Sequence, residues 1–260
     1  MYRANAVKAR LKAGQGAFGI FNNLASPLVA ELSGLAGYDF VLIDGEHGAG
    51  GFEDHRAMIQ AVQTTSAGAF IRVAKNDPAM LKRVLDLGVE GVMIPSISNA
   101  EEARAAIAAC LYPPNGKRGY AAPVVRASEF GLRAGDYVGR GAAGAELVVM
   151  LQIETAAGAA NAMEICAVGG FDVVFLGPGD LSGDLGALGR FDHPDFLKAV
   201  SVVEAAAKAH GKILGCLPYP GASLEQLWER GYRVLTPGSD VAMLREAMLQ
   251  QLALLRPDRP

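Results

Sequence analysis

The segment LVVMLQIETAAGAANAMEICAVGGFDVVFLGPGD, residues 147–180, decides the fold. Two mainly apolar runs, Leu147–Ile153 and Asp172–Gly177, flank a stretch of helical period, Ala156–Val168. A strand that is apolar along its whole length is typical of a parallel sheet, because helices cover both of its faces. The segment therefore predicts a strand, a helix and a second strand that runs parallel to the first.

The same alternation continues in both directions along the chain. Further strands are expected at Ala17–Asn22, Phe40–Asp44, Ala69–Val73, Gly91–Pro95, Lys212–Leu217 and Arg233–Pro237. Further helices are expected at Pro27–Gly37, Glu53–Thr65, Pro78–Leu87, Ala100–Cys110, Pro194–His210, Leu224–Arg230 and Ser239–Leu255. Eight strand–helix pairs in 260 residues predict an α/β fold, a (β/α)₈ TIM barrel, because such a barrel takes about 250 residues.

No boundary between domains is visible, so residues 1–260 are expected to form one barrel domain. A doubly wound sheet is disfavoured, since the first strand, with Gly19-Ile20-Phe21, is not followed by a glycine-rich turn. The long irregular stretch Tyr112–Glu146 exceeds an ordinary connection, and we interpret it as a functional or interface loop.

The composition excludes several classes of protein. Twenty-four basic and 27 acidic residues give a net charge of −3, which supplies no basic face for nucleic acid and no anchor for a membrane surface. The sequence contains no run of about twenty apolar residues, which is the length that a membrane-spanning helix needs. Three scattered cysteines without a CxxC pair predict a reducing compartment, the cytoplasm, and no thiolate zinc site.

Glu154 and Asp180 follow two strands that are neighbours in the predicted barrel, at the end where the chemistry of such barrels collects. Two unpaired carboxylates side by side would repel one another. A divalent cation relieves this repulsion, and two protein oxygens completed by water and substrate suit Mg²⁺ or Mn²⁺, with Co²⁺ as a further option. The alternative is that each carboxylate merely caps a helix start. The pairing on neighbouring strands favours the metal.

A histidine and an arginine lie at the same predicted end. His47 closes the run Asp44-Gly45-Glu46-His47 and can act as a base near neutral pH, although a surface loop would also accommodate it. Arg72 stands within an apolar strand, where a charge is costly unless it is paired. We expect Arg72 to point to the barrel mouth, toward an anion or toward Glu46.

The turn Gly177-Pro178-Gly179-Asp180 does not match the dinucleotide fingerprint, because Ser182 stands where a third glycine is needed. The backbone N–H groups of residues 179–182 could still hold a carboxylate at a helix start. A Schiff-base mechanism needs a lysine at a strand end, and Lys75 is the one lysine near a mouth. A metal mechanism is therefore preferred.

These residues resemble the metal-dependent class II pyruvate aldolases of the HpcH/HpaI family, from about residue 10 to 250. The matching motifs are Asp39-Phe40-Val41-Leu42-Ile43-Asp44-Gly45-Glu46-His47, Ile71-Arg72-Val73, Asn76-Asp77-Pro78, Leu81-Lys82-Arg83-Val84-Leu85-Asp86-Leu87-Gly88, Tyr112-Pro113-Pro114-Asn115-Gly116-Lys117-Arg118-Gly119, Gln152-Ile153-Glu154-Thr155 and Gly177-Pro178-Gly179-Asp180-Leu181-Ser182. Several motifs in one order are more specific than any single motif.

The resemblance implies a cytoplasmic enzyme that reversibly cleaves a 4-hydroxy-2-oxo acid to pyruvate and an aldehyde, through a metal-stabilised pyruvate enolate. Glu154 and Asp180 would hold the metal. The remaining roles would fall to Arg72 at the keto oxygen, His47 as base with Asp44 and Asp86 in support, and Gln152, Gly179, Asp180 and Ser182 around pyruvate. The resemblance also implies a homo-oligomer, a hexamer in which the last helix is exchanged between subunits.

Two departures concern the aldehyde partner. Family members often read Arg-Val-Pro-Trp where this chain has Arg72-Val73-Ala74-Lys75, and many carry alanine at the position of Gly179. The role of Lys75 is left open.

Two other functions also stay open. A coenzyme A-thioester lyase of the citrate-lyase β-subunit type would share the barrel, but it needs basic groups for a diphosphate and usually a C-terminal lid. A non-catalytic keto-acid-binding protein would be expected to lose His47 or Arg72, and both are present.

Overall fold

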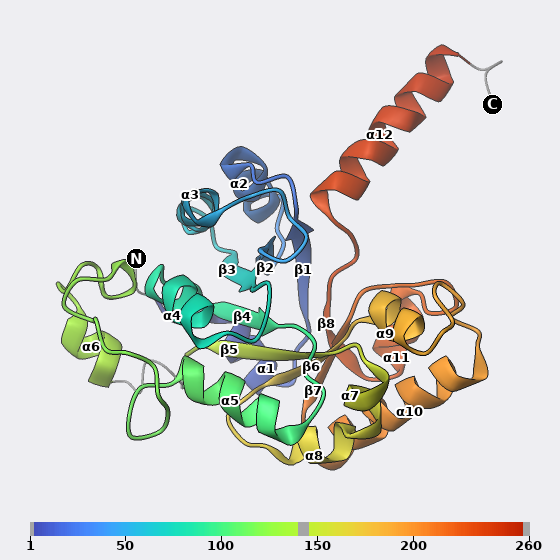
Figure 1. The fold of residues 1–260 in the computed structure, drawn as a ribbon. Helices are drawn as coiled ribbons and strands as arrows, with labels where there is room; N and C mark the ends of the chain where they lie inside the picture. Colours follow the sequence, from blue (N-terminus) through green and yellow to red (C-terminus); the bar gives the residue numbers. More distant parts are fainter. Residues whose placement is uncertain (1–2, 140–145, 257–260) are drawn as a thin grey trace.

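A computed structural model describes residues 3–139 and 146–256, in which eight parallel strands close into a barrel (Figure 1). The strands are β1 (Ala17–Asn22), β2 (Phe40–Asp44), β3 (Gly68–Arg72), β4 (Gly91–Ile94), β5 (Val148–Ile153), β6 (Val173–Leu176), β7 (Ile213–Cys216) and β8 (Tyr232–Leu235). Each strand pairs with the next one in the sequence, and β8 pairs with β1. The predicted (β/α)₈ barrel is confirmed.

Helices surround the barrel and also close one of its ends. They are α1 (Ala6–Lys12), α2 (Pro27–Leu35), α3 (Phe52–Val62), α4 (Pro78–Asp86), α5 (Ala100–Cys110), α6 (Ala134–Gly139), α7 (Ala156–Ala160), α8 (Ala162–Ala167), α9 (Pro178–Asp184), α10 (Pro194–Ala209), α11 (Leu224–Glu229) and α12 (Asp240–Leu255). Side chains cap many of the starts: Asp77, Asn99, Ser223 and Ser239 each accept a hydrogen bond from a backbone N–H of the helix that follows.

Two expected segments differ in detail. The predicted helix Ala156–Val168 is divided at Asn161 into α7 and α8. The stretch Tyr112–Glu146, predicted to be irregular, contains α6 and a short 3₁₀ helix, Arg126–Ser128, while its residues 140–145 lie outside the described part. Its helical turns are supported by a small core of Tyr112, Ala122, Ala127 and Tyr137.

Side chains along each strand alternate between the barrel interior and the layer under the helices. On β2, Phe40 and Leu42 belong to the interior cluster, while Val41 and Ile43 belong to the outer layer. The period of two places Asp44 on the interior side at the carboxyl end of β2. Because all eight strands are parallel, the inward side chains of their last residues meet at one end, the barrel mouth.

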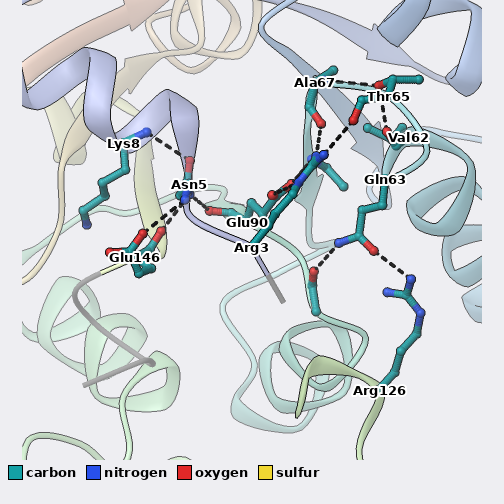
Figure 2. Close-up of polar contacts among 12 residues, drawn as sticks. Arg3, Asn5, Lys8, Val62, Gln63, Thr65, Ala67, Glu90, Arg126 and Glu146 are labelled. Atoms are coloured by element: carbon teal, nitrogen blue, oxygen red, sulfur yellow. Dashed lines mark hydrogen bonds and ion pairs between the residues drawn. The ribbon is translucent and has the colours of Figure 1, made fainter. Parts of the chain in front are cut away.

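The opposite end is closed by α1 and the residues before it. Val7 and Leu11 are buried in the interior cluster. Arg3 pairs with Glu90 at 2.6 Å and donates to the carbonyl of Thr65 at 2.6 Å (Figure 2). These acceptors precede strands, so the N-terminal segment ties the amino ends of the barrel together.

Asn5 is the centre of this network (Figure 2). Its side-chain amide donates to the carbonyls of Glu90 at 2.6 Å and Glu146 at 2.7 Å, and its Oδ1 accepts the N–H of Lys8 at 3.0 Å. Lys8 continues the network, since its Nζ donates to the carbonyl of Leu147 at 2.6 Å. One buried asparagine therefore caps α1 and fastens it to the starts of two strands.

Helix α12 projects from the barrel instead of lying against it (Figure 1). The apolar stripe predicted on this helix is exposed, with Leu244 at 46%, Met248 at 60%, Leu252 at 45% and Leu255 at 78% of their full exposure. None of the described helices is both long and apolar enough to cross a membrane. Because the stripe is exposed, it is not buried against the barrel of its own chain.

We expect Asn5→Ala to lower the free energy of unfolding by about 1–3 kcal/mol, because two partly buried carbonyls lose their donor and α1 loses its cap. Urea unfolding at fixed protein concentration measures the loss. The control is Asn115→Ala at an exposed loop position, for which a change within about 0.5 kcal/mol is expected. Equal losses for the two variants would contradict the role assigned to Asn5.

Candidate active site

The mouth of the barrel holds two adjoining cavities of about 500 and 450 Å³, and His47 and Asp180 line both of them. The larger is lined by Phe21, Asn23, Asp44, His47, Arg72, Gln152, Gly177, Pro178, Gly179, Asp180, Leu217, Pro218, Thr236, Pro237, Gly238, Ser239 and Ala242. The smaller is lined by Glu46, His47, Ser96, Glu154, Thr155, Asp180, Gly183, Asp184 and Leu188. Most of the predicted site residues therefore meet at one place.

Asp44 and Arg72 form a buried ion pair across the last register position of β2 and β3. Arg72 donates from Nε to Asp44 Oδ1 at 2.9 Å and from Nη2 to Oδ2 at 2.7 Å. Burial alone would raise the pKa of Asp44, but the hydrogen bonds and charge of Arg72 outweigh it and hold the pKa below its usual value. Asp44 is therefore a carboxylate that fixes the guanidinium.

The expected pairing of Arg72 with Glu46 is also present. Arg72 Nη1 lies 3.0 Å from Glu46 Oε2, and the guanidinium lies over the ring of Phe21 at 5.0 Å. Of five guanidinium N–H groups, two donate to Asp44 and one nitrogen faces Glu46. Arg72 also lines the larger cavity.

His47 lies at the rim of the site, with its side chain 65% exposed. Asp44 Oδ1 accepts the backbone N–H groups of Glu46 at 3.1 Å and His47 at 3.2 Å, which fixes the turn after β2. His47 Nε2 lies 3.8 Å from Glu46 Oε2. The imidazole is thus open to a substrate and close to a carboxylate.

Glu154 is buried at the end of β5, and one of its oxygens has no protein partner. Oε1 accepts the backbone N–H of Ser96 at 2.8 Å and its hydroxyl at 2.9 Å. Oε2 has no hydrogen-bond partner among the described residues. Burial raises the pKa of Glu154 to about 7, against the hydrogen bonds from Ser96, which lower it.

Gly177 makes room for this carboxylate, because a Cβ atom at position 177 would lie 2.5 Å from Glu154 Oε2. Asp180 lies one turn further along, within α9, and its charge adds to the rise in the pKa of Glu154. An unpartnered carboxylate oxygen near a second carboxylate is a donor set that fits a hard cation. In the described part of the chain no three His, Cys, Asp or Glu side chains form a metal-binding group.

Two further buried oxygens in the larger cavity have no partner among the described residues. They are Gln152 Oε1 and Thr236 Oγ1, on side chains that are 3% and 0% exposed. Buried polar atoms usually find a partner, so these two indicate that a ligand or water completes the site.

The predicted residues Gly179 and Ser182 both lie in α9. Gly179 lines the cavity, as expected, and open space surrounds the position that a Cβ would take. Ser182 is buried below it, where its hydroxyl donates to the Gly179 carbonyl at 2.7 Å and accepts the N–H of Gly189 at 3.0 Å. Ser182 therefore braces α9, and the cavity linings do not include it.

Asp86 is not brought to this mouth. It ends α4, and its carboxylate accepts a hydrogen bond at 2.7 Å from Arg118, which is buried between Tyr112 and Tyr137. Lys75 is exposed after β3 and lies outside both cavity linings. Within one chain the site therefore forms without either residue.

The sequence reasoning missed Asn23, Ser96 and Thr236. Asn23 Nδ2 donates to Asp44 Oδ2 at 2.6 Å, and Ser96 supplies both donors to Glu154. Each follows a strand, at β1, β4 and β8 respectively. The signal that could have found them is a polar residue one or two positions after a buried strand, searched for at all eight strand ends.

The chain is similar to known proteins over most of its length. The HpcH/HpaI aldolase/citrate lyase family matches residues 17–247. The chain is 43% identical over 233 residues to 2-dehydro-3,6-dideoxy-6-sulfogluconate aldolase of Pseudomonas putida, over 89% of each chain. It is 36% identical over 249 residues to 5-keto-4-deoxy-D-glucarate aldolase of Shigella boydii, over 96% of this chain and 95% of that one.

A solved structure is similar as well. A crystal structure of an HpcH/HpaI aldolase/citrate lyase family protein from Burkholderia cenocepacia superposes with a TM-score of 0.91 at 34% identity, over 97% of this chain and 99% of that one. The match extends over the barrel and includes every strand end that lines the site. The chain therefore belongs to the HpcH/HpaI aldolase/citrate lyase family and is a carbon–carbon lyase.

Proposed function

We propose that this protein catalyses the reversible aldol cleavage of a 4-hydroxy-2-oxo acid to pyruvate and an aldehyde. The observation that carries the proposal is Arg72, a buried cation fixed by Asp44. It lines the larger cavity together with Asp180, and Asp180 and Glu154 line the adjoining smaller cavity. The two relatives at 43% and 36% identity are named as aldolases, which favours this reaction over a coenzyme A-thioester lyase.

Glu154 and Asp180 would hold a divalent cation, Mg²⁺, Mn²⁺ or Co²⁺. The buried, unpartnered Glu154 Oε2 supports this, because such an oxygen is costly without a positive partner. A bound cation would supply positive charge for the carboxylate and keto oxygens of pyruvate. Gln152 and the N–H groups of Gly179 and Asp180 would bind the remainder of the pyruvate unit.

Arg72 would stabilise the charge that develops during bond cleavage. When the C3–C4 bond breaks, its electron pair moves into the pyruvate unit and negative charge collects on the keto oxygen. A donor that is already held in place acts like an oxyanion-hole group, since it needs no reorganisation. The two hydrogen bonds from Arg72 to Asp44 provide this fixed orientation.

His47 would accept the proton of the C4 hydroxyl, directly or through one bound water. Its exposure at the rim suits contact with the aldehyde half of the substrate, which must enter and leave. Asp44 supports His47 by fixing the backbone of its turn. A keto-acid-binding protein without catalysis would not need His47 as a base.

We also propose that the protein forms a homo-oligomer, a hexamer in which α12 packs on a neighbouring subunit. The exposed apolar side chains of α12 support this, as do Leu28, Leu32 and Leu35 on α2, which are 77%, 64% and 70% exposed.

A mass measurement at micromolar concentration should therefore give an oligomer for the intact chain. The double variant Met248→Asp, Leu252→Asp should shift the mass toward the monomer, because charge on the stripe opposes its burial. An intact chain that is a clean monomer, or a double variant that keeps the full mass, would refute exchange through α12.

Activity should require a divalent cation. Exhaustive treatment with EDTA should abolish cleavage of a 4-hydroxy-2-oxo acid, and added Mg²⁺, Mn²⁺ or Co²⁺ should restore it. Borohydride in the presence of pyruvate should leave the protein mass unchanged. Cleavage that survives EDTA, or pyruvate trapped on Lys75, would exclude this mechanism.

The raised pKa of Glu154 predicts a pH dependence of stability in the metal-free protein. The folded state favours protonated Glu154, so this group stabilises it fully below about pH 4.5 and ceases to do so as pH rises through about 7. The thermal midpoint should fall over this interval, and Glu154→Gln should flatten the fall. Glu164→Gln, at an exposed position, is the control and should leave it unchanged. Identical pH profiles for wild type and Glu154→Gln would contradict the assignment.

Variants of Arg72 and His47 should lose different sets of activities, because the two residues act in different half-reactions. Arg72→Ala should lower both aldol cleavage and exchange of the pyruvate methyl protons by about 10² to 10³. His47→Ala should lower cleavage by about 10² to 10⁴ but harm oxaloacetate decarboxylation less, because oxaloacetate has no hydroxyl to deprotonate. Equal loss of both activities in His47→Ala would remove the base assignment. Full proton exchange in Arg72→Ala would leave the arginine as a structural ion-pair partner.

A further inference from the structure

Asn23 lies at the mouth, directly after β1, and lines the larger cavity. Its side-chain amide donates from Nδ2 to Asp44 Oδ2 at 2.6 Å. The preceding residue, Asn22, points the other way, toward Ser33 of α2. The alternation along β1 thus gives two adjacent asparagines different surroundings.

The acceptors of Asp44 show what Asn23 contributes. Oδ1 accepts three N–H groups, from Arg72 and from the backbone of Glu46 and His47. Oδ2 accepts Arg72 Nη2 at 2.7 Å and Asn23 Nδ2 at 2.6 Å. Among the described residues, Asn23 is therefore the donor that holds Oδ2 independently of Arg72. It opposes rotation of the carboxylate, and the carboxylate in turn sets the plane of the guanidinium.

Asn23 is itself held from the start of α12. Asp240 Oδ1 accepts the backbone N–H of Asn23 at 2.8 Å, and Oδ2 accepts that of Leu24 at 3.1 Å. Asp240 is 6% exposed, whereas the side chains that follow it on α12 are mostly exposed. The first turn of α12 is thus joined to the loop after β1 by two bonds to a buried carboxylate.

We propose that Asn23 is a positioning residue, whose amide, anchored by Asp240, holds Asp44 and through it Arg72 in the orientation that the reaction requires. The inference rests on the role proposed above for Arg72. It adds a series of contacts from Asp240, at the start of α12, through Asn23 and Asp44 to the guanidinium of Arg72.

Three variants test the contact. Asn23→Ala removes the donor, and we expect kcat for cleavage to fall about 10-fold, a size typical of residues that orient a functional group. Asn23→Asp keeps the shape but places a carboxylate against Asp44, and should lose more than Asn23→Ala. Asn22→Ala is the matched control. Its side-chain amide donates to the Phe21 carbonyl and to Ser33, each at 3.4 Å, and not to Asp44, so its kcat should stay unchanged.

The Michaelis constant separates positioning from direct substrate contact. If Asn23 acts through Arg72, kcat and kcat/KM should fall together and KM should change little. A rise in KM with kcat retained would mean that Asn23 binds substrate itself, which overturns the proposal. An Asn23→Asp variant at least as active as Asn23→Ala would overturn it too.

A double-mutant cycle with Asp44→Asn tests the route. Pyruvate methyl-proton exchange, followed by NMR, provides a sensitive readout. Asn23→Ala should cost about 10-fold in the wild-type background and nothing further in Asp44→Asn, because the two residues act in series. Additive losses would overturn the proposal. Asp240→Ala should also reduce the exchange, provided that the variant keeps the oligomeric mass of the wild type. Combined with Asn23→Ala, it should cause no further loss.

The same cycle read by thermal unfolding midpoints keeps this inference apart from the proposed function. A wild-type protein without aldolase or exchange activity would refute the function, while coupling of the Asn23 and Asp44 midpoints would still support the contact. Independent midpoints together with an active wild type and an unimpaired Asn23→Ala would refute the inference and leave the function standing.

Discussion

The ion pair between Asp44 and Arg72 is the interaction on which the site depends. A buried charge is costly unless its partner and its remaining polar atoms are satisfied. Here β2 and β3 bring the two residues to the same register position, and four other groups complete the arrangement: the backbone of Glu46 and His47, the Glu46 carboxylate and the Asn23 amide. The pair therefore positions three features together: the Arg72 guanidinium, the turn that carries His47 and the edge of the cavity.

The carboxylate at the end of β5 shows the opposite condition. Asp44 is saturated with donors and its pKa lies below the usual value, whereas Glu154 retains an unpartnered oxygen and its pKa is raised to about 7. Two carboxylates at one mouth thus differ because of their neighbours, not their chemistry. The first is part of the scaffold, and the second is open to a ligand.

Much of the barrel could be predicted, because buried parallel strands are apolar throughout and therefore stand out in the sequence. The same rule located Glu154, Arg72 and His47, since each lies at or just after the end of such a strand. Asn23 escaped because an asparagine after a strand is also an ordinary turn residue, and its partner is distant in sequence. The direction of α12 could not be predicted from the sequence, because an apolar stripe does not indicate which barrel it covers. Asp86 came from resemblance alone, and within one chain it pairs with Arg118.

The closure of the barrel by α1 has a consequence for how such an enzyme can diversify. Arg3, Asn5 and Lys8 fasten the amino ends of the strands, while the reacting groups stand at the carboxyl ends. Folding and chemistry thus draw on separate sets of residues, joined by an interior of packed apolar side chains. Substitutions among the loops at the mouth can alter which aldehyde is accepted without loosening the closure at the far end. The sequence is therefore free to change its substrate range while its architecture persists.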